Sequence, residues 1–234
     1  MRYLIKYTKE ADIKFISHLD LLRTIQRSIR RSELPIHYSQ GFNPHMATSI
    51  AQPLSVGVYS DGEYMDMELD EEVDLDEIVE RLNKSSARGV KFSKAVFIPA
   101  PKQNEKKVPQ AMALIDGARY IMKIKYSDLS NFDKEMEELM NKEEWIMTKR
   151  SKRSEREVDI RPMVKEIKYW SKDDEGIFNV LISAGSREHL SADLVVDLIK
   201  KNTTNVLNDE FVDIKREEMY CFKGDKLVPL YECI

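Results

Sequence analysis

The sequence predicts an α+β fold made of two tandem ferredoxin-like (βαββαβ) units with antiparallel sheets. In residues 1–98, segments of period two and of period 3.6 follow one another as β-α-β-β-α-β, the order of the split ferredoxin-like motif. The same order returns in outline after residue 117, with an extra strand or a long hairpin. A segment with three prolines separates the two halves. Element order alone supports the tandem arrangement, because the halves share no residue-level repeat.

The first half starts with residues 2–9 (RYLIKYTK), which alternate apolar and polar side chains and so predict a half-buried strand. Ser17 stands three residues before Asp20, a capping-box-like spacing that predicts a helix running to about Ser32. Pro35 ends it, because proline disfavours helical geometry in the preceding residue. The other expected elements are strands at 46–51, 63–70 and 90–98 and a helix at 74–86.

Residues 99–117 have no strong periodicity and contain a basic, polar cluster, so we interpret them as a linker. This division predicts an N-terminal domain at 1–98 and a C-terminal domain at 118–234. The second half is expected to contain strands at 118–126, 144–150, 156–170, 176–184 and 211–222 and helices at 130–142 and 190–202.

Composition limits the class of protein. The chain has 234 residues, 42% of them hydrophobic, and a formal net charge of −4, which excludes a general basic coat but permits a local basic site. Its two cysteines, Cys221 and Cys233, are too few for a disulfide framework, a four-thiolate zinc site or a three-cysteine iron–sulfur site. No apolar run approaches the roughly 20 residues that span a bilayer. We therefore expect a protein of the reducing cytoplasm, without cofactor or metal.

The helix predicted to begin near Ser17 has a basic face. On a helical wheel its apolar residues lie on one side and four arginines on the other: Arg23, Arg27, Arg30 and Arg31. Neighbouring guanidinium groups repel, so the cluster suggests an acidic partner. One candidate is phosphate, which suits bidentate arginine donors. The other is the chain's own segment 61–80, which has eleven Asp and Glu and no Lys or Arg. The alternative to both is an ordinary solvated face of the helix.

A second basic run occupies residues 149–156 (KRSKRSER), with five Lys or Arg and one Glu. Together with the arginine helix it fits an electrostatic groove for RNA or another polyanion. The candidate binding residues in and after this run are Lys149, Arg150, Arg153 and Arg161.

The segment 35–45 (PIHYSQGFNPH) is expected to lead from the first helix to the second strand. Gly41 permits unusual backbone geometry, and Asn43-Pro44 favours a turn. Its candidate binding residues are the rings of Tyr38, Phe42 and His45, which could stack on a base, and the polar side chains of Ser39 and Asn43. The alternative is a structural loop whose aromatic side chains tuck under the sheet.

Two histidines are the candidate catalytic residues. His18 is expected at a helix N-terminus, where the dipole favours the neutral imidazole, and with His45 it could form a base–acid pair or ligate a metal. The alternative for His18 is an ordinary core residue on the apolar side of its helix. The sequence has no phosphate-binding, dinucleotide, zinc-protease or nucleophile-elbow motif.

Three stretches together resemble a known family: "FISHLDLLRTIQRSIRR", "YSQGFNPHM" and "PLSVGVYSDGEYMDMEL". They are similar to the bacterial radical-SAM-linked proteins grouped as the DUF2344 domain. The resemblance is close from Phe15 to Leu69 and looser at 156–164 and 183–199. Met46 stands where the family usually has a second proline.

The resemblance implies a partner and a setting. Members accompany a radical-SAM protein of the cobalamin-binding type, sometimes as its C-terminal fusion, and are often encoded near ribosome and RNA-processing genes. The family supplies no established catalytic residues. Because two cysteines cannot hold a three-cysteine cluster, any radical chemistry belongs to another protein.

Three hypotheses follow. The first is a non-catalytic accessory protein that binds RNA or a related anionic substrate and partners a radical-SAM enzyme, with no role at DNA or membranes. The second is a metal-independent RNA-processing endonuclease that uses His18 or His45. Gly224 is the only glycine in 203–234, which disfavours this class because it often has a glycine-rich C-terminal loop. The third is a protein–protein adaptor that uses the acidic segment 61–80.

Overall fold

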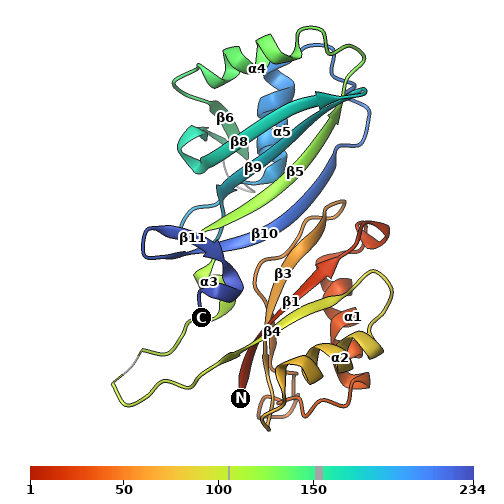
Figure 1. Ribbon diagram of the computed structural model, residues 1–234, viewed down its shortest axis with the longest axis vertical. Coiled ribbons are helices and arrows are strands. Elements are labelled where there is room, and N and C mark those ends of the chain that lie inside the picture. Colours follow the sequence, from red (N-terminus) through yellow and green to blue (C-terminus); the bar gives the residue numbers. More distant parts are fainter. Residues whose placement is uncertain (105, 151–154) are drawn as a thin grey trace. The chain divides into compact units, whose positions relative to one another are not determined.

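The computed structural model describes residues 1–104, 106–150 and 155–234 (Figure 1). The chain has an α+β fold and divides into two compact units. Unit 1 consists of Met1–Asp116 and Arg216–Ile234, and unit 2 consists of Gly117–Lys215. Within these ranges, no helix is long and apolar enough to cross a membrane.

Unit 1 is built on an antiparallel sheet with β1 in the middle. The order is β4 (Phe92–Ile98), β1 (Arg2–Lys9) and β3 (Tyr59–Glu68), and the short β2 (Thr48–Ile50) pairs with β3. In this register Ile5 lies opposite both Met65 and Ala95. Helices α1 (His18–Arg31) and α2 (Leu75–Ser85) cover one face of the sheet (Figure 1). The strand and helix order expected for residues 1–98 is therefore present.

Local signals set the limits of α1. The Ser17 side chain accepts a hydrogen bond from the Asp20 amide at 3.2 Å, which is the predicted cap. Leu21, Ile25 and Ile29 follow at helical spacing and are buried against the sheet. After Ser32, Glu33 takes a φ of 56°, a left-handed conformation that stops the helix.

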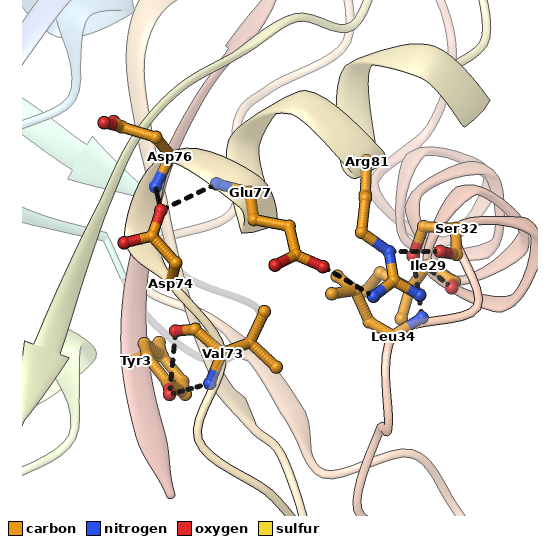
Figure 2. A network of polar contacts seen from close by, with 9 residues as sticks. All are labelled: Tyr3, Ile29, Ser32, Leu34, Val73, Asp74, Asp76, Glu77 and Arg81. Atoms are coloured by element: carbon orange, nitrogen blue, oxygen red, sulfur yellow. Dashed lines mark hydrogen bonds and ion pairs between the residues drawn. The ribbon is translucent and has the colours of Figure 1, made fainter.

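Helix α2 is held at both ends, as Figure 2 shows. At its start, Asp74 Oδ1 accepts hydrogen bonds from the amides of Asp76 and Glu77 at 2.9 and 3.1 Å. Near its end, Arg81 donates to the Ser32 carbonyl at 2.9 Å and to Glu77 at 3.1 Å. Arg81 therefore ties α2 to the last turn of α1.

The C-terminal residues complete unit 1. Strand β10 (Asp213–Lys223) lies beside β3, and β11 (Lys226–Pro229) pairs with β10. At the approach of β3 and β10, a Cβ on Gly62 would lie 2.5 Å from the Glu217 carbonyl oxygen, so this position requires glycine. Cys221 in β10 forms a disulfide with Cys233, with a Cα–Cα distance of 6.3 Å.

This arrangement differs from the predicted domain limits, which gave 118–234 to the second domain. Residues from Arg216 onward belong to unit 1, because their polar side chains find partners there. Arg216 pairs with Glu63, and Glu218 accepts from Tyr64 at 2.7 Å and from Lys6 at 2.5 Å. The predicted linker also packs on unit 1: α3 (Ala111–Leu114) begins with the Ala111 amide bonded to Asp66 at 2.8 Å.

Unit 2 has its own antiparallel sheet in the order β5 (Gly117–Lys125), β9 (Glu175–Ser183) and β8 (Val164–Lys172). A separate ribbon joins β6 (Ile146–Arg150) to β7 (Glu155–Asp159). Helices α4 (Phe132–Met140) and α5 (Ala192–Asn202) supply the buried residues of one side of the core, where Phe132 contacts Phe178 at 5.8 Å between ring centres.

The prediction of one strand over 156–170 was wrong. The chain breaks between β7 and β8 at a 3-10 turn, Arg161–Met163. Pro162 has no amide hydrogen to donate to a ladder, and Asp159 Oδ1 accepts from the amides of Trp145 and Arg161 at 2.8 and 3.0 Å. The identity of unit 2 as a complete ferredoxin-like unit stays a prediction.

Candidate functional site

The exposed side of α1 forms a basic surface. We call Arg23, Arg27 and Arg30 the arginine face; all three are exposed. Arg23 donates to Asp20 at 3.1 Å in an ion pair that is itself exposed. The hydroxyl of Ser17, then Arg23, lowers the pKa of Asp20, with a smaller contribution from Arg27. Arg27 and Arg30 form no hydrogen bond or ion pair with any residue that the structure describes.

Arg31 does not belong to this face. Its guanidinium turns toward α2 and donates to the Ser85 carbonyl at 2.8 Å, which joins the ends of the two helices. The hollow beside it, about 730 Å³, is also bordered by Arg81 and Lys84. Helix C-termini attract cations, so these basic side chains complement the helix ends and Arg31 has a structural role.

The acidic segment 61–80 does not neutralise the arginine face. Its carboxylates have other partners: Glu63 pairs with Arg216, Asp66 with Arg2 at 2.7 Å and Glu77 with Arg81 at 3.1 Å. Among the described contacts of this segment, none reaches Arg23, Arg27 or Arg30. The internal-pairing alternative for this face is therefore wrong. The exposed acidic residues that remain are Glu71, Glu72, Asp76 and Glu80.

Residues 38–45 form a closed loop with an exposed tip. The Ser39 amide donates to the His45 carbonyl at 2.8 Å, and the His45 amide donates to the Ser39 hydroxyl at 3.0 Å. At the tip Gly41 has a φ of 127°, and the Phe42 side chain is fully exposed. Asn43 Nδ2 approaches His45 Nε2 at 3.4 Å. Phe42 points into solvent, so the alternative in which it tucks under the sheet is wrong, whereas Tyr38 keeps 37% of its surface exposed.

The structure does not bring His18 and His45 together. His18 begins α1 and so follows the end of β1, whereas the loop with His45 lies beside the start of β1, since the His37 amide bonds to the Glu68 carbonyl. The eight residues of β1 span about 25 Å. In the described ranges no group of three or more His, Cys, Asp or Glu could hold a metal ion.

Of the candidate residues in and after the second basic run, the structure describes the side chains of Lys149 and Arg161. Lys149 donates to the His189 carbonyl at 2.9 Å, within unit 2. Arg161 is partly buried, stacks over the Trp145 ring at 5.7 Å and donates to the Met140 carbonyl at 3.3 Å, so it stabilises the fold. Arg150 belongs to β6, but its side chain lies outside the described parts of the chain, as does all of Arg153.

Unit 1 contains a buried polar cluster that was not predicted from the sequence. Arg216 and Glu63 are joined there by two hydrogen bonds of 2.8 and 2.6 Å, and Arg216 also donates to the Gln52 carbonyl at 3.1 Å. The nearby Tyr7 hydroxyl is buried without a hydrogen-bond partner, and burial followed by the charge of Glu63 raises its pKa. Burial lowers the pKa of Lys9, which donates to the Lys14 carbonyl at 2.8 Å. Only the strand alternation could have indicated that these polar groups face the core.

Comparison with solved structures shows a similar fold. A chain of a Cbf5–Nop10–Gar1 complex matches with a TM-score of 0.51 and 11% sequence identity, over 93% of this chain and 48% of that one. A chain of an archaeal box H/ACA sRNP Nop10–Cbf5 complex matches with a TM-score of 0.45 and 11% identity, over 92% and 46%. This chain thus spans about half the length of those it matches.

No curated protein matches the chain by sequence. A family described as an uncharacterized protein conserved in bacteria, DUF2344, matches residues 2–192. That range includes the whole arginine face, the loop 38–45 and most of unit 2. The chain therefore belongs to the DUF2344 family.

Proposed function

We propose that this protein is a non-catalytic accessory protein that binds RNA through the arginine face and partners a radical-SAM enzyme. The observation that carries the proposal is the exposure of Arg23, Arg27 and Arg30, while the acidic segment 61–80 pairs with other arginines. Cations spaced three or four residues apart on one side of a helix repel by a few tenths of a kcal/mol per pair. A phosphate backbone removes this repulsion and gains entropy as its counterions are released.

The loop 38–45 extends the proposed RNA site. Its Phe42 side chain is fully exposed, His45 is exposed, and Tyr38 leaves 37% of its surface in solvent. Unstacked bases of single-stranded RNA pack on such rings, while Ser39 and Asn43 offer polar groups to sugar or base edges. The arginines would therefore supply affinity and the loop would supply contacts to bases.

The radical-SAM partner rests on the family resemblance of the sequence and on the chain's own chemistry. This sequence has only Cys221 and Cys233, so its own residues cannot supply the three cysteines of such a cluster. The finer interpretation of the fold is that unit 1 is the first of two ferredoxin-like units. The likeness to the Cbf5 chain concerns the fold, and the proposal rests on this chain's own residues.

The test is a pull-down of the tagged protein from its native cell, with and without nuclease, with identification of bound RNA and protein. The variant is Arg23→Glu, Arg27→Glu, Arg30→Glu. Its matched control is Lys91→Glu, Lys106→Glu, Lys107→Glu, an equal change of charge at exposed positions of unit 1. We expect RNA to be lost only from the arginine variant and a radical-SAM protein to remain bound in all samples.

Two outcomes contradict the proposal. If both variants retain RNA equally, the arginine face is not the RNA site. If no sample contains RNA and a protein partner survives nuclease, the chain is a protein–protein adaptor, and the exposed acidic residues of 61–80 become the surface to change next.

A further inference from the structure

The sheet of unit 2 has two different faces. On β8, Tyr169 points toward the helices and contacts the Phe132 ring at 6.1 Å between centres. Because side chains alternate along a strand, its neighbours Lys168 and Trp170 point to the opposite face. The register of β8 and β9 places Asn179 beside Lys168 and Ile177 beside Trp170. We call this helix-free side the open face.

The registers define four rows of the open face across β5, β9 and β8. The first row holds Arg119, Leu181 and Glu166, and the second holds Ile121, Asn179 and Lys168. The third holds Lys123, Ile177 and Trp170, and the fourth holds Lys125, Glu175 and Lys172. Five cations thus share these four rows with two carboxylates.

Both carboxylates are already engaged. Glu166 accepts from Arg119 at 2.7 Å, which lowers the pKa of that carboxyl, and Glu175 lies 4.0 Å from Lys123. Lys168 and Lys172 are exposed and form no hydrogen bond or ion pair to other described residues. Lys125 on β5 likewise makes no ion pair with a described residue. The other two unpaired cations of these rows lie on β8, the edge strand of the sheet: Lys168 and Lys172.

Trp170 lies between these two lysines and leaves 43% of its surface in solvent. Its ring makes no aromatic or cation–π contact within the described ranges. By contrast, Trp145 is 4% exposed and donates its indole N–H to the Leu139 carbonyl at 3.0 Å. Lys168 and Lys172 are four residues apart, about 13 Å along the strand, with the indole midway.

We propose that the open face of unit 2 binds single-stranded RNA, with a base stacked on Trp170 and phosphates contacting Lys168 and Lys172. An exposed aromatic ring flanked by cations on an antiparallel sheet offers both interactions that single strands use. A duplex keeps its bases paired inside and cannot stack one on the ring. The inference deepens the proposed RNA-binding function and rests on it, but it uses residues of another unit.

Intrinsic fluorescence tests the inference, because the chain has only two tryptophans and one is buried. The probe is a twelve-nucleotide oligouridylate, added to the full chain at several salt concentrations. We expect quenching of Trp170 by the single strand and much less by a duplex of the same length. Trp170→Phe keeps a stacking ring, so it should lose the quenching and retain the affinity, measured by anisotropy of labelled RNA.

Trp170→Ala should weaken oligouridylate binding about tenfold, within the range measured for one stacked base. Lys168→Ala should reduce the salt dependence by about one phosphate contact. The matched control is Lys134→Ala, an exposed lysine on α4, which should change neither quantity. Circular dichroism and thermal melts establish that each variant is folded.

The outcomes separate this inference from the proposed function. If Trp170→Ala binds RNA like the parent while the arginine-face variant does not, the open face is not an RNA site and the proposed function stands. If the parent protein binds no RNA, the proposed function and the inference about the open face are both wrong. If polyglutamate quenches Trp170 as strongly as oligouridylate does, the open face binds an acidic protein and not RNA. That result also overturns the inference.

Discussion

Arg216 and Glu63 face each other inside unit 1, 153 residues apart in sequence and each with 1% of its side chain exposed. Their two parallel hydrogen bonds, of 2.8 and 2.6 Å, fix β10 beside β3. Removal of water from both charges is costly, so the pair is stable only while it is complete. This contact explains why the last residues of the chain belong with the first.

Arg216→Met should lower the free energy of unfolding by about 3–5 kcal/mol, because it leaves the Glu63 carboxylate buried without a counter-charge. The double variant Glu63→Leu, Arg216→Met should recover most of this loss, since it removes both charges. Urea unfolding measures both. The control is Arg88→Met, which breaks an exposed pair with Asp12 and should cost under about 1 kcal/mol. A double variant no more stable than Arg216→Met would contradict the explanation.

Arg30 and Arg31 are adjacent but should respond in opposite ways. Arg31→Ala removes the hydrogen bond to the Ser85 carbonyl, so the free energy of unfolding should fall by about 1–2 kcal/mol. The affinity for RNA should stay unchanged. Arg30→Ala should leave stability unchanged and reduce the salt dependence of RNA binding by about one contact. Thermal melts and binding at a series of salt concentrations separate the two effects. Equal loss of affinity in both variants would place Arg31 in the RNA site.

The disulfide should stabilise the end of unit 1. Cys221→Ser, Cys233→Ser should lower the free energy of unfolding by about 2–3 kcal/mol, as expected for a short closed loop. Hydrogen exchange should rise first in β11 and the residues after it. Dithiothreitol should reproduce the effect in the parent and leave the double variant unchanged. A parent whose melting temperature does not respond to dithiothreitol would show that the bond does not contribute.

Asp193 should make unit 2 less stable as pH rises. Burial, then the charge of Asp197, raises the pKa of this carboxyl above its ordinary value of 3.8. The folded state therefore favours the protonated form. The resulting stability is complete below pH 3.8 and is lost as pH rises through the higher folded pKa. Asp193→Asn should remove this dependence and raise the melting temperature at pH 7, and NMR titration should show the raised pKa directly. A melting curve equally pH-dependent in the variant would assign the effect elsewhere.

The sequence correctly predicted those features of the fold that depend on interactions between residues close together in the chain. Ser17 and Asp20 cap α1 as expected, and the wheel that separated Ile25 from Arg27 matches their burial and exposure. Such signals extend over one or two helical turns. Pro162 was the local signal that was overlooked, because the residues on both sides of it alternate like a single strand.

Long-range contacts could not be predicted in this way. No pattern near Arg216 indicates that its partner is Glu63, because the choice depends on which strand lies beside β10. The same limit applied to Arg31, which looks like its neighbours on a wheel but meets Ser85 of another helix. The alternation in β8 indicated that one side of this strand is exposed. The residues that surround Trp170 on that side could be identified only from the register with β9.

The position of β10 has a consequence for synthesis of the protein. The ribosome makes Met1–Asp116, then the whole of Gly117–Lys215, and only afterwards the strand that completes the first sheet. At roughly 5–20 residues per second, the nascent chain waits several seconds with the edge of β3 uncovered and Glu63 without its arginine. During that interval the uncovered edge of β3 can pair with a strand of another chain. A chaperone that prevents such pairing would have to cover this edge.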